Sequence, residues 1–207
     1  MARRRPGPNI GKTRFDQLEV ENLADLRDWL AANAETKETL WLVRWRKSDE
    51  TLADGRYMPM LDIIDELLCV GWVDSVVAKR DAASSYVRIS PRNPKSAWSK
   101  VNKDKIEKLE TEGRMMPAGR RLVETAKTNG MWDFLNDVDA GIVPEDLSLA
   151  LQARNATGKF EALPFSVRRG TLEFIKTAKT LPTREKRISE TVKWASEGKA
   201  LPAFRRG

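Results

Sequence analysis

The stretch Y-V-R-I-S-P-R-N-P-K-S-A-W-S-K-V-N-K, residues 86–103, decides how the chain passes from a sheet into a helix. Its first residues alternate between β-branched or aromatic and polar side chains, which indicates a strand. Pro91 and Pro94 exclude a regular helix between them. The chain is therefore expected to leave a strand, cross a stiff turn and enter a helix near Ala97.

This stretch contains five cations and no acid, and the cations are Arg88, Arg92, Lys95, Lys100 and Lys103. Tyr86 and Trp98 add flat aromatic faces. Ser96 is a candidate N-cap, and the free N–H groups of the first turn, beside Lys95 and Lys100, could receive an anion. The alternative is a solvated basic turn whose Trp98 belongs to the core.

The composition is that of a folded protein with a core. The chain has 207 residues, of which 41% are hydrophobic and seven are tryptophan, a length that suits one large domain or two small ones. No apolar run approaches the roughly 20 residues of a membrane span, and the N-terminus lacks the apolar segment of a signal peptide. Cys69 is the single cysteine, which agrees with a reducing compartment. We expect a cytoplasmic protein.

The absence of histidine excludes many catalytic and metal sites. It removes histidine-dependent nucleophiles, histidine general bases and histidine metal ligands. The sequence also has no glycine-rich phosphate loop, carboxylate metal cluster or cofactor fingerprint. No catalytic residue, metal or cofactor is therefore predicted, and a binding role is favoured over an enzymatic one.

Basic charge is concentrated at the N-terminus. Residues 1–14 hold five of the seven net positive charges and no acid. Their prolines and glycines predict a flexible basic arm. Because the remainder is nearly balanced, net charge is weak support for nucleic-acid binding by the folded part.

Periodicity predicts an α+β fold: a small antiparallel sheet with helices in the N-terminal half and an all-helical C-terminal half. Strands are expected at 15–20, 40–46, 72–79 and 84–90, and helices at 22–33, 59–71 and 97–112. In 40–46 the aromatic face is expected to pack inward and the arginines outward. Further helices are expected at 118–128, 144–154, 165–179 and 183–197. The predicted organisation is an arm at 1–14, an α+β domain at 15–112 and a helical region at 113–207.

Asp74 is the best single acid for a site, because it could face Arg88 or Arg92 across the predicted hairpin. Such a pair is more often structural than catalytic. A second basic cluster opens the last helix, where cations oppose the helix dipole. This conflict predicts an acidic partner for Arg184 or Arg187, either an internal carboxylate or an external anion.

Several motifs together resemble one family. They are L-C-V-G-W-V-D-S (68–75), R-I-S-P-R-N-P-K-S-A-W-S-K-V-N-K (88–103), E-G-R-M (112–115), M-P-A-G (116–119), P-E-D-L (144–147), I-K-T-A-K-T (175–180) and T-R-E-K-R-I (183–188). In this order they resemble the YdeI/OmpD-associated, or bacteriocin-protection, family over nearly the whole chain after the arm. The residues before Leu67 and the arginine-rich arm depart from the pattern. The resemblance implies an association with stress or antimicrobial tolerance and no particular reaction.

The leading hypothesis is a cytoplasmic, non-enzymatic stress-tolerance protein that binds a small anionic ligand or a protein partner at the basic turn. The predicted ligand-binding residues are Trp72, Asp74, Tyr86, Arg88, Arg92, Lys95, Ser96, Trp98 and Lys100. One alternative is nucleic-acid binding, with the arm on phosphates and the turn positioning the strand. The other is an unrecognised enzyme that uses Asp74 or Lys100.

Overall fold

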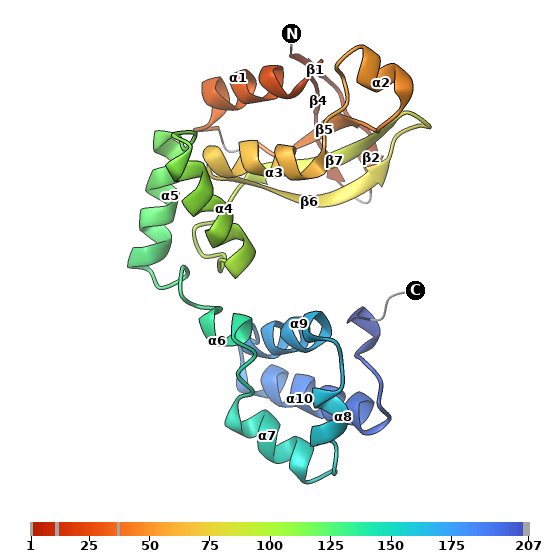
Figure 1. The fold of residues 1–207 in the computed structure, drawn as a ribbon, viewed down its shortest axis with the longest axis vertical. Helices are drawn as coiled ribbons and strands as arrows, with labels where there is room; N and C mark the ends of the chain where they lie inside the picture. The colour runs from red at the N-terminus through yellow and green to blue at the C-terminus, as the bar shows by residue number, and fades with distance from the viewer. Residues whose placement is uncertain (1, 11–12, 37, 205–207) are drawn as a thin grey trace. The chain divides into compact units, whose positions relative to one another are not determined.

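The structure, a computed structural model, describes residues 2–10, 13–36 and 38–204. These residues contain a mixed five-stranded sheet, a separate two-stranded hairpin and ten α-helices, which confirms the α+β class (Figure 1). The prediction of a purely antiparallel sheet is wrong, because one pair of neighbouring strands is parallel. The chain folds into two compact units, Met1–Trp132 and Asp133–Gly207. The first unit extends past the boundary predicted after residue 112. How these units correspond to domains stays a prediction.

The sheet of the first unit has the strand order β1-β4-β5-β7-β6. Its strands are β1 (Arg3–Arg5), β4 (Gln17–Glu19), β5 (Leu40–Trp45), β6 (Trp72–Lys79) and β7 (Ser84–Pro91). The β4 and β5 strands are parallel and are joined through helix α1 (Leu23–Asn33), while the other neighbours are antiparallel. The predicted hairpin is therefore present as β6 and β7, and β6 lies at the edge of the sheet.

Part of the segment predicted to be an arm lies in the sheet. Strand β1 pairs with β4, so that Arg4 lies opposite Leu18, and the Arg4 side chain forms ion pairs with Asp16 and Glu38. A short hairpin follows, made of β2 (Asn9–Ile10) and β3 (Thr13–Arg14). Residues 11–12 of the predicted arm lie outside the described residues. The flexibility of the arm stays a prediction.

Strand β5 is buried on both faces, which differs from the predicted inward aromatic face. Leu40 and Leu42 belong to the main core beneath α1 and α3 (Met60–Cys69), as Val87 of the neighbouring strand does (Figure 1). On the opposite face the Trp41 ring is also buried, 6.1 Å from the Tyr86 ring centre. A strand that is buried on both faces has no exposed polar face, so the alternation of its side chains does not indicate which face points toward the core.

Helices α1 and α3 of the first unit begin and end where their capping residues indicate. Asn22 caps α1 by accepting the Asp25 N–H at 3.0 Å, as predicted. Helix α3 starts after Pro59 and ends before Gly71, which has a φ of 78°. The other helices are α2 (Asp49–Ala53), α4 (Lys100–Thr111) and α5 (Pro117–Thr128). Ser48 and Thr51 form a capping box at the start of the short helix α2.

Two of the quoted motifs, L-C-V-G-W-V-D-S and M-P-A-G, contact each other. The Met116 N–H donates to the Cys69 carbonyl at 2.9 Å, at the start of α5. A Cβ atom on Gly119 would lie 2.4 Å from the same carbonyl oxygen, so only glycine allows α5 to approach the end of α3 this closely. These motifs thus have a packing role.

The described residues of the second unit form helices and no strand. They are α6 (Asn136–Asp139), α7 (Glu145–Gln152), α8 (Thr157–Glu161), α9 (Phe165–Lys176), α10 (Leu181–Ser196) and a 3₁₀ turn at Pro202–Phe204. Three of these helices, α7, α9 and α10, were predicted within a few residues of their bounds. Leu147, Leu151, Phe160 and Ile175 are buried between them.

Candidate functional site

Arg92 of the predicted basic site is a buried structural residue. Its N–H donates to the Gly71 carbonyl at 3.0 Å, and its guanidinium donates to the Ala97 carbonyl at 2.5 Å. The guanidinium carbon also lies 4.0 Å from the centre of the Trp98 ring. Burial lowers the pKa of Arg92 to about 10, so it stays a cation at neutral pH. These contacts fasten the proline turn to the end of α3.

Both tryptophans of the predicted site lie in the core. Trp98 is 1% exposed, its N–H donates to the Met131 carbonyl at 3.1 Å, and its ring packs 5.3 Å from the ring of Trp132. Trp72 is also 1% exposed and donates from Nε1 to the Ala34 carbonyl at 3.2 Å. The flat ring faces suggested for ligand stacking are therefore covered in this structure.

The ion pair suggested for Asp74 with Arg88 or Arg92 does not form. Asp74 lies opposite Ile89 and has no side-chain partner among the described residues. The Arg88 Nε donates instead to the Ser75 hydroxyl at 2.8 Å, next to a register shift in β6. Charges and bulges on edge strands hinder pairing between sheets, which gives Asp74 a structural explanation.

The remaining predicted residues do not converge on one cavity. Tyr86 donates its hydroxyl proton to Gln17 at 3.1 Å, on the sheet face opposite α3. Lys95 is exposed, and Lys100 pairs with Asp104 at 2.8 Å one turn along α4. Ser96 does not cap α4, which begins three residues later than predicted. The ligand-binding role of these residues stays a prediction.

Ser99 caps α4 instead, and the reason lies in the preceding residue. The N–H of Trp98 is held by the Met131 carbonyl, which keeps the chain extended past Ala97. The Ser99 hydroxyl then accepts the Asn102 N–H at 3.4 Å. The helix terminus proposed to receive an anion is therefore displaced from Lys95 and Ser96.

A buried charge cluster in the first unit was not predicted. The Glu66 side chain is 1% exposed and accepts hydrogen bonds from Arg27 at 2.9 Å and from Arg114 at 2.8 Å. Its neighbour Asp65 pairs with Lys105. The sequence did contain a signal for this cluster, because the adjacent acids Asp65 and Glu66 interrupt the apolar face of residues 61–69. Buried charges that are paired in this way usually stabilise one packing arrangement.

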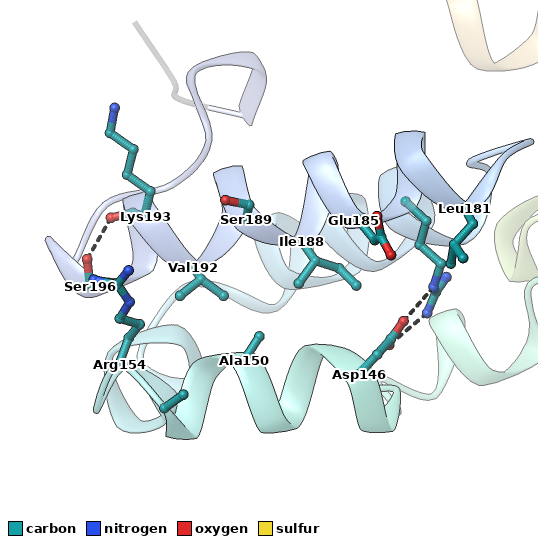
Figure 2. A pocket seen from close by; sticks show the side chains of 12 residues that line it. Asp146, Ala150, Arg154, Leu181, Glu185, Ile188, Ser189, Val192, Lys193 and Ser196 are labelled. Atoms are coloured by element: carbon teal, nitrogen blue, oxygen red, sulfur yellow. Dashed lines mark hydrogen bonds and ion pairs between the residues drawn. The ribbon is translucent and has the colours of Figure 1, made fainter.

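A groove of about 710 Å³ lies in the second unit (Figure 2). It runs between α7 and α10, which meet because their apolar residues Leu147, Leu151 and Val192 are buried in the same unit. The lining residues are Asp146, Ala150, Ala153, Arg154, Leu181, Arg184, Glu185, Ile188, Ser189, Val192, Lys193 and Ser196. The groove volume is typical of small-molecule sites.

One end of the groove is closed by an ion pair between α7 and α10. Arg184 donates to both carboxylate oxygens of Asp146, from Nε at 2.6 Å and from Nη2 at 2.9 Å (Figure 2). The hydrogen bonds from Arg184 lower the pKa of Asp146. The prediction of an acidic partner for Arg184 is thus confirmed, with an internal carboxylate. Arg187 instead donates to the Phe174 carbonyl.

Replacing Asp146 with asparagine is expected to destabilise the second unit by less than about 1 kcal/mol at pH 7, because both side chains are partly exposed. Because the pKa of Asp146 is lowered in the folded state, the ion pair contributes fully to the free energy of unfolding above the unfolded-state pKa of about 3.9. This contribution is lost as the pH falls through the folded-state pKa. Calorimetric unfolding of both proteins should therefore show a difference at pH 7 that disappears near pH 2. A difference that grows on acidification would contradict this assignment.

The other end of the groove carries two cations. Helix α7 ends at Gln152, and the turn that follows it contains Asn155, whose φ of 50° is left-handed. Arg154 of this turn lines the groove. Lys193 lies at the same end, near Ser196 (Figure 2). Neither Arg154 nor Lys193 has an ion-pair or hydrogen-bond partner for its charged group among the described residues, whereas the nearby Lys159 donates to the Ser196 carbonyl at 2.5 Å.

Among the described residues, no group of three or more Cys, Asp or Glu side chains is placed to hold a metal. Burial raises the pKa of the Cys69 thiol to about 11, which keeps it in the unreactive neutral form at pH 7. No described helix is long and apolar enough to cross a membrane.

Two family models match this sequence, one for each unit. Residues 18–122 match the domain of unknown function DUF8412, and residues 140–198 match the model described as Bacteriocin-protection, YdeI or OmpD-Associated. Neither the comparison with curated proteins nor that with solved structures gives a match. The fold and the matches define an α+β protein of two compact units, the second of which is helical in its described residues.

The chain belongs to the DUF8412 family through the larger match and carries a bacteriocin-protection, YdeI or OmpD-associated domain in its second unit. The family resemblance found in the sequence is thereby confirmed for residues 140–198, and not for the earlier part of the chain over which it was also predicted. The P-E-D-L, I-K-T-A-K-T and T-R-E-K-R-I motifs lie within 140–198. The earlier motifs lie within 18–122, in the stretch that the other model matches. The groove lies wholly in the bacteriocin-protection domain.

Proposed function

We propose that this protein is a non-enzymatic binding protein whose ligand occupies the groove between α7 and α10. The observation that carries the proposal is the groove itself, which combines an apolar floor with charged ends. Ala150, Ile188 and Val192 form part of the floor, and the Asp146–Arg184 pair closes one end. Sites with an apolar lining and a few polar groups are typical of small-molecule binding.

The groove has more support as the binding site than the basic turn predicted from the sequence. Arg92 and Trp98 are buried and bonded within the first unit, and Lys100 is paired with Asp104. An anion at that turn would have to compete with these contacts. Arg154 and Lys193 have no ion-pair or hydrogen-bond partner for their charged groups among the described residues, and Lys193 has only a cation–π contact of 5.7 Å with the Trp194 ring. The basic turn as an anion acceptor therefore stays a prediction, with exposed Lys95 as its main support.

The cellular role is part of the same proposal. A protein of the bacteriocin-protection type that holds a ligand in this groove would contribute to stress tolerance by sequestering that ligand. A cytoplasmic location is proposed because Cys69 is a free buried thiol, which suits a reducing compartment. Nucleic-acid binding through the arm and an enzymatic role for Asp74 or Lys100 stay alternatives.

Filling the groove tests the proposal. The full-length protein is titrated with 8-anilinonaphthalene-1-sulfonate, an apolar fluorescent probe with one sulfonate group. Replacing Ala150 with tryptophan is expected to weaken binding of the probe at least about tenfold, because the indole ring would occupy the floor. Ser189→Trp, from the opposing helix, provides a second blocking variant. Circular dichroism confirms that each variant is folded.

Leu149→Trp is the matched control, since Leu149 is an exposed residue of the same helix that does not line the groove. This variant is expected to bind the probe as the unmodified protein does. If both blocking variants fold and bind the probe with unchanged affinity, the groove is not the binding site and the proposal fails.

A further inference from the structure

We infer that the groove takes a single-chain anionic amphiphile, which is an apolar chain that ends in a carboxylate or phosphate group. This inference rests on the proposed function, because it assigns a ligand class to the same site. It follows from three features of the groove: its length, its apolar floor and the placement of two cations that have no carboxylate partner.

The groove is long enough for an extended chain. The lining residues of α10 extend from Leu181 to Ser196, which corresponds to a length of about 22 Å. A volume of about 710 Å³ is within the range of small-molecule sites. A single hydrocarbon chain can therefore lie along α10.

The floor of the groove suits an apolar chain along its whole length. Ile188 and Val192 face the groove from successive turns of α10, and Ala150 faces them from α7 (Figure 2). Leu181 at the far end is 67% exposed, so a bound chain would remove additional apolar surface from water. The alanines keep the two helices from filling the groove with their own side chains.

The charged residues at the two ends of the groove determine the orientation of the bound ligand and the sign of the charge on its head group. At the Leu181 end, Arg184 is already neutralised by Asp146, and Glu185 adds a negative charge. At the opposite end, Arg154 and Lys193 have no carboxylate partner among the described residues. An anionic head group is therefore favoured beside Arg154 and Lys193, with its chain directed toward Leu181.

The test compares two amphiphiles of equal chain length and opposite charge. Isothermal titration calorimetry of the full-length protein measures the affinity for dodecanoate and for dodecyltrimethylammonium, each below the concentration at which it forms micelles. The double variant Arg154→Gln/Lys193→Gln is expected to weaken dodecanoate binding at least about tenfold and to leave the cationic amphiphile unweakened. Lys186→Gln, an exposed cation of α10 outside the groove, is the control and should bind dodecanoate normally.

The outcomes separate this inference from the proposed function. If the double variant binds dodecanoate as tightly as the unmodified protein, the ligand class is wrong. The same conclusion follows if both amphiphiles bind equally and Ala150→Trp blocks both, although the groove then remains the binding site. If Ala150→Trp and Ser189→Trp leave dodecanoate binding unchanged, the groove itself is excluded. Binding to phosphatidylglycerol vesicles without binding of monomeric dodecanoate also contradicts the inference, because it indicates a bilayer surface as the target.

Discussion

Replacing Glu66 with alanine is expected to destabilise the first unit by about 3–5 kcal/mol. The Glu66 side chain is 1% exposed, and it accepts hydrogen bonds from both Arg27 and Arg114. Its charge raises the pKa of Arg27 through these contacts. Removing the carboxylate leaves Arg114, which is only 30% exposed, without one of its two acidic partners and opens a cavity beside the core.

Urea unfolding followed by tryptophan fluorescence measures this effect, because six of the seven tryptophans lie in the first unit. Glu107→Ala is the matched control, since Glu107 is an exposed acid of α4. Its unfolding free energy should change by less than about 0.5 kcal/mol. A cost below about 1 kcal/mol for Glu66→Ala would show that the buried cluster does not hold α1, α3 and the chain after α4 together.

Replacing Gly119 with valine is expected to cost about 3 kcal/mol or more in the same unit. Even the first added carbon would lie 2.4 Å from the Cys69 carbonyl oxygen and 2.9 Å from its carbon, and these atoms belong to backbone that cannot rotate away. Helix α5 would have to move away from α3. This movement would break the hydrogen bond from Met116 to the Cys69 carbonyl.

Thermal unfolding of the full-length protein tests the valine variant. Gly158→Ala is the control, because Gly158 lies in helix α8 with no atom within 4 Å of an added Cβ. Alanine there should be neutral or stabilise the second unit by up to about 1 kcal/mol. An unchanged midpoint for Gly119→Val would contradict the close packing of the two motifs.

At residues 86–103 the sequence predicted the path of the backbone better than the roles of the side chains. The strand, the stiff proline turn and the following helix were all predicted, because proline and β-branched residues act locally. A core position for Trp98 was the alternative prediction, and the structure bears it out. The buried role of Arg92 was not predicted, since its contacts with the Ala97 carbonyl and the Trp98 ring depend on how the turn packs. Arg92, which is one cation of a basic stretch in the sequence, is a buried residue that holds the proline turn in the fold.

The groove could not be predicted from the sequence. Its two walls come from α7 and α10, which are separated by two other helices, and amphipathic patterns do not state which helices meet. The conflict between Arg184 and the dipole of α10 did predict an acidic partner. The identity of that partner as Asp146 required the structure. The free Arg154 and Lys193 gave no sequence signal, because isolated surface cations are common.

Chemical-shift mapping tests most directly that the ligand binds in the groove. The full-length protein, labelled with nitrogen-15, is titrated with dodecanoate below its micelle concentration. The largest amide shift changes are expected in α7 and α10, at Ala150, Ser189 and Ser196, while the amides of Lys95, Ser96 and Lys100 stay unchanged. Shift changes concentrated at Lys95–Lys100, with α7 and α10 unaffected, would contradict the account and return the site to the basic turn.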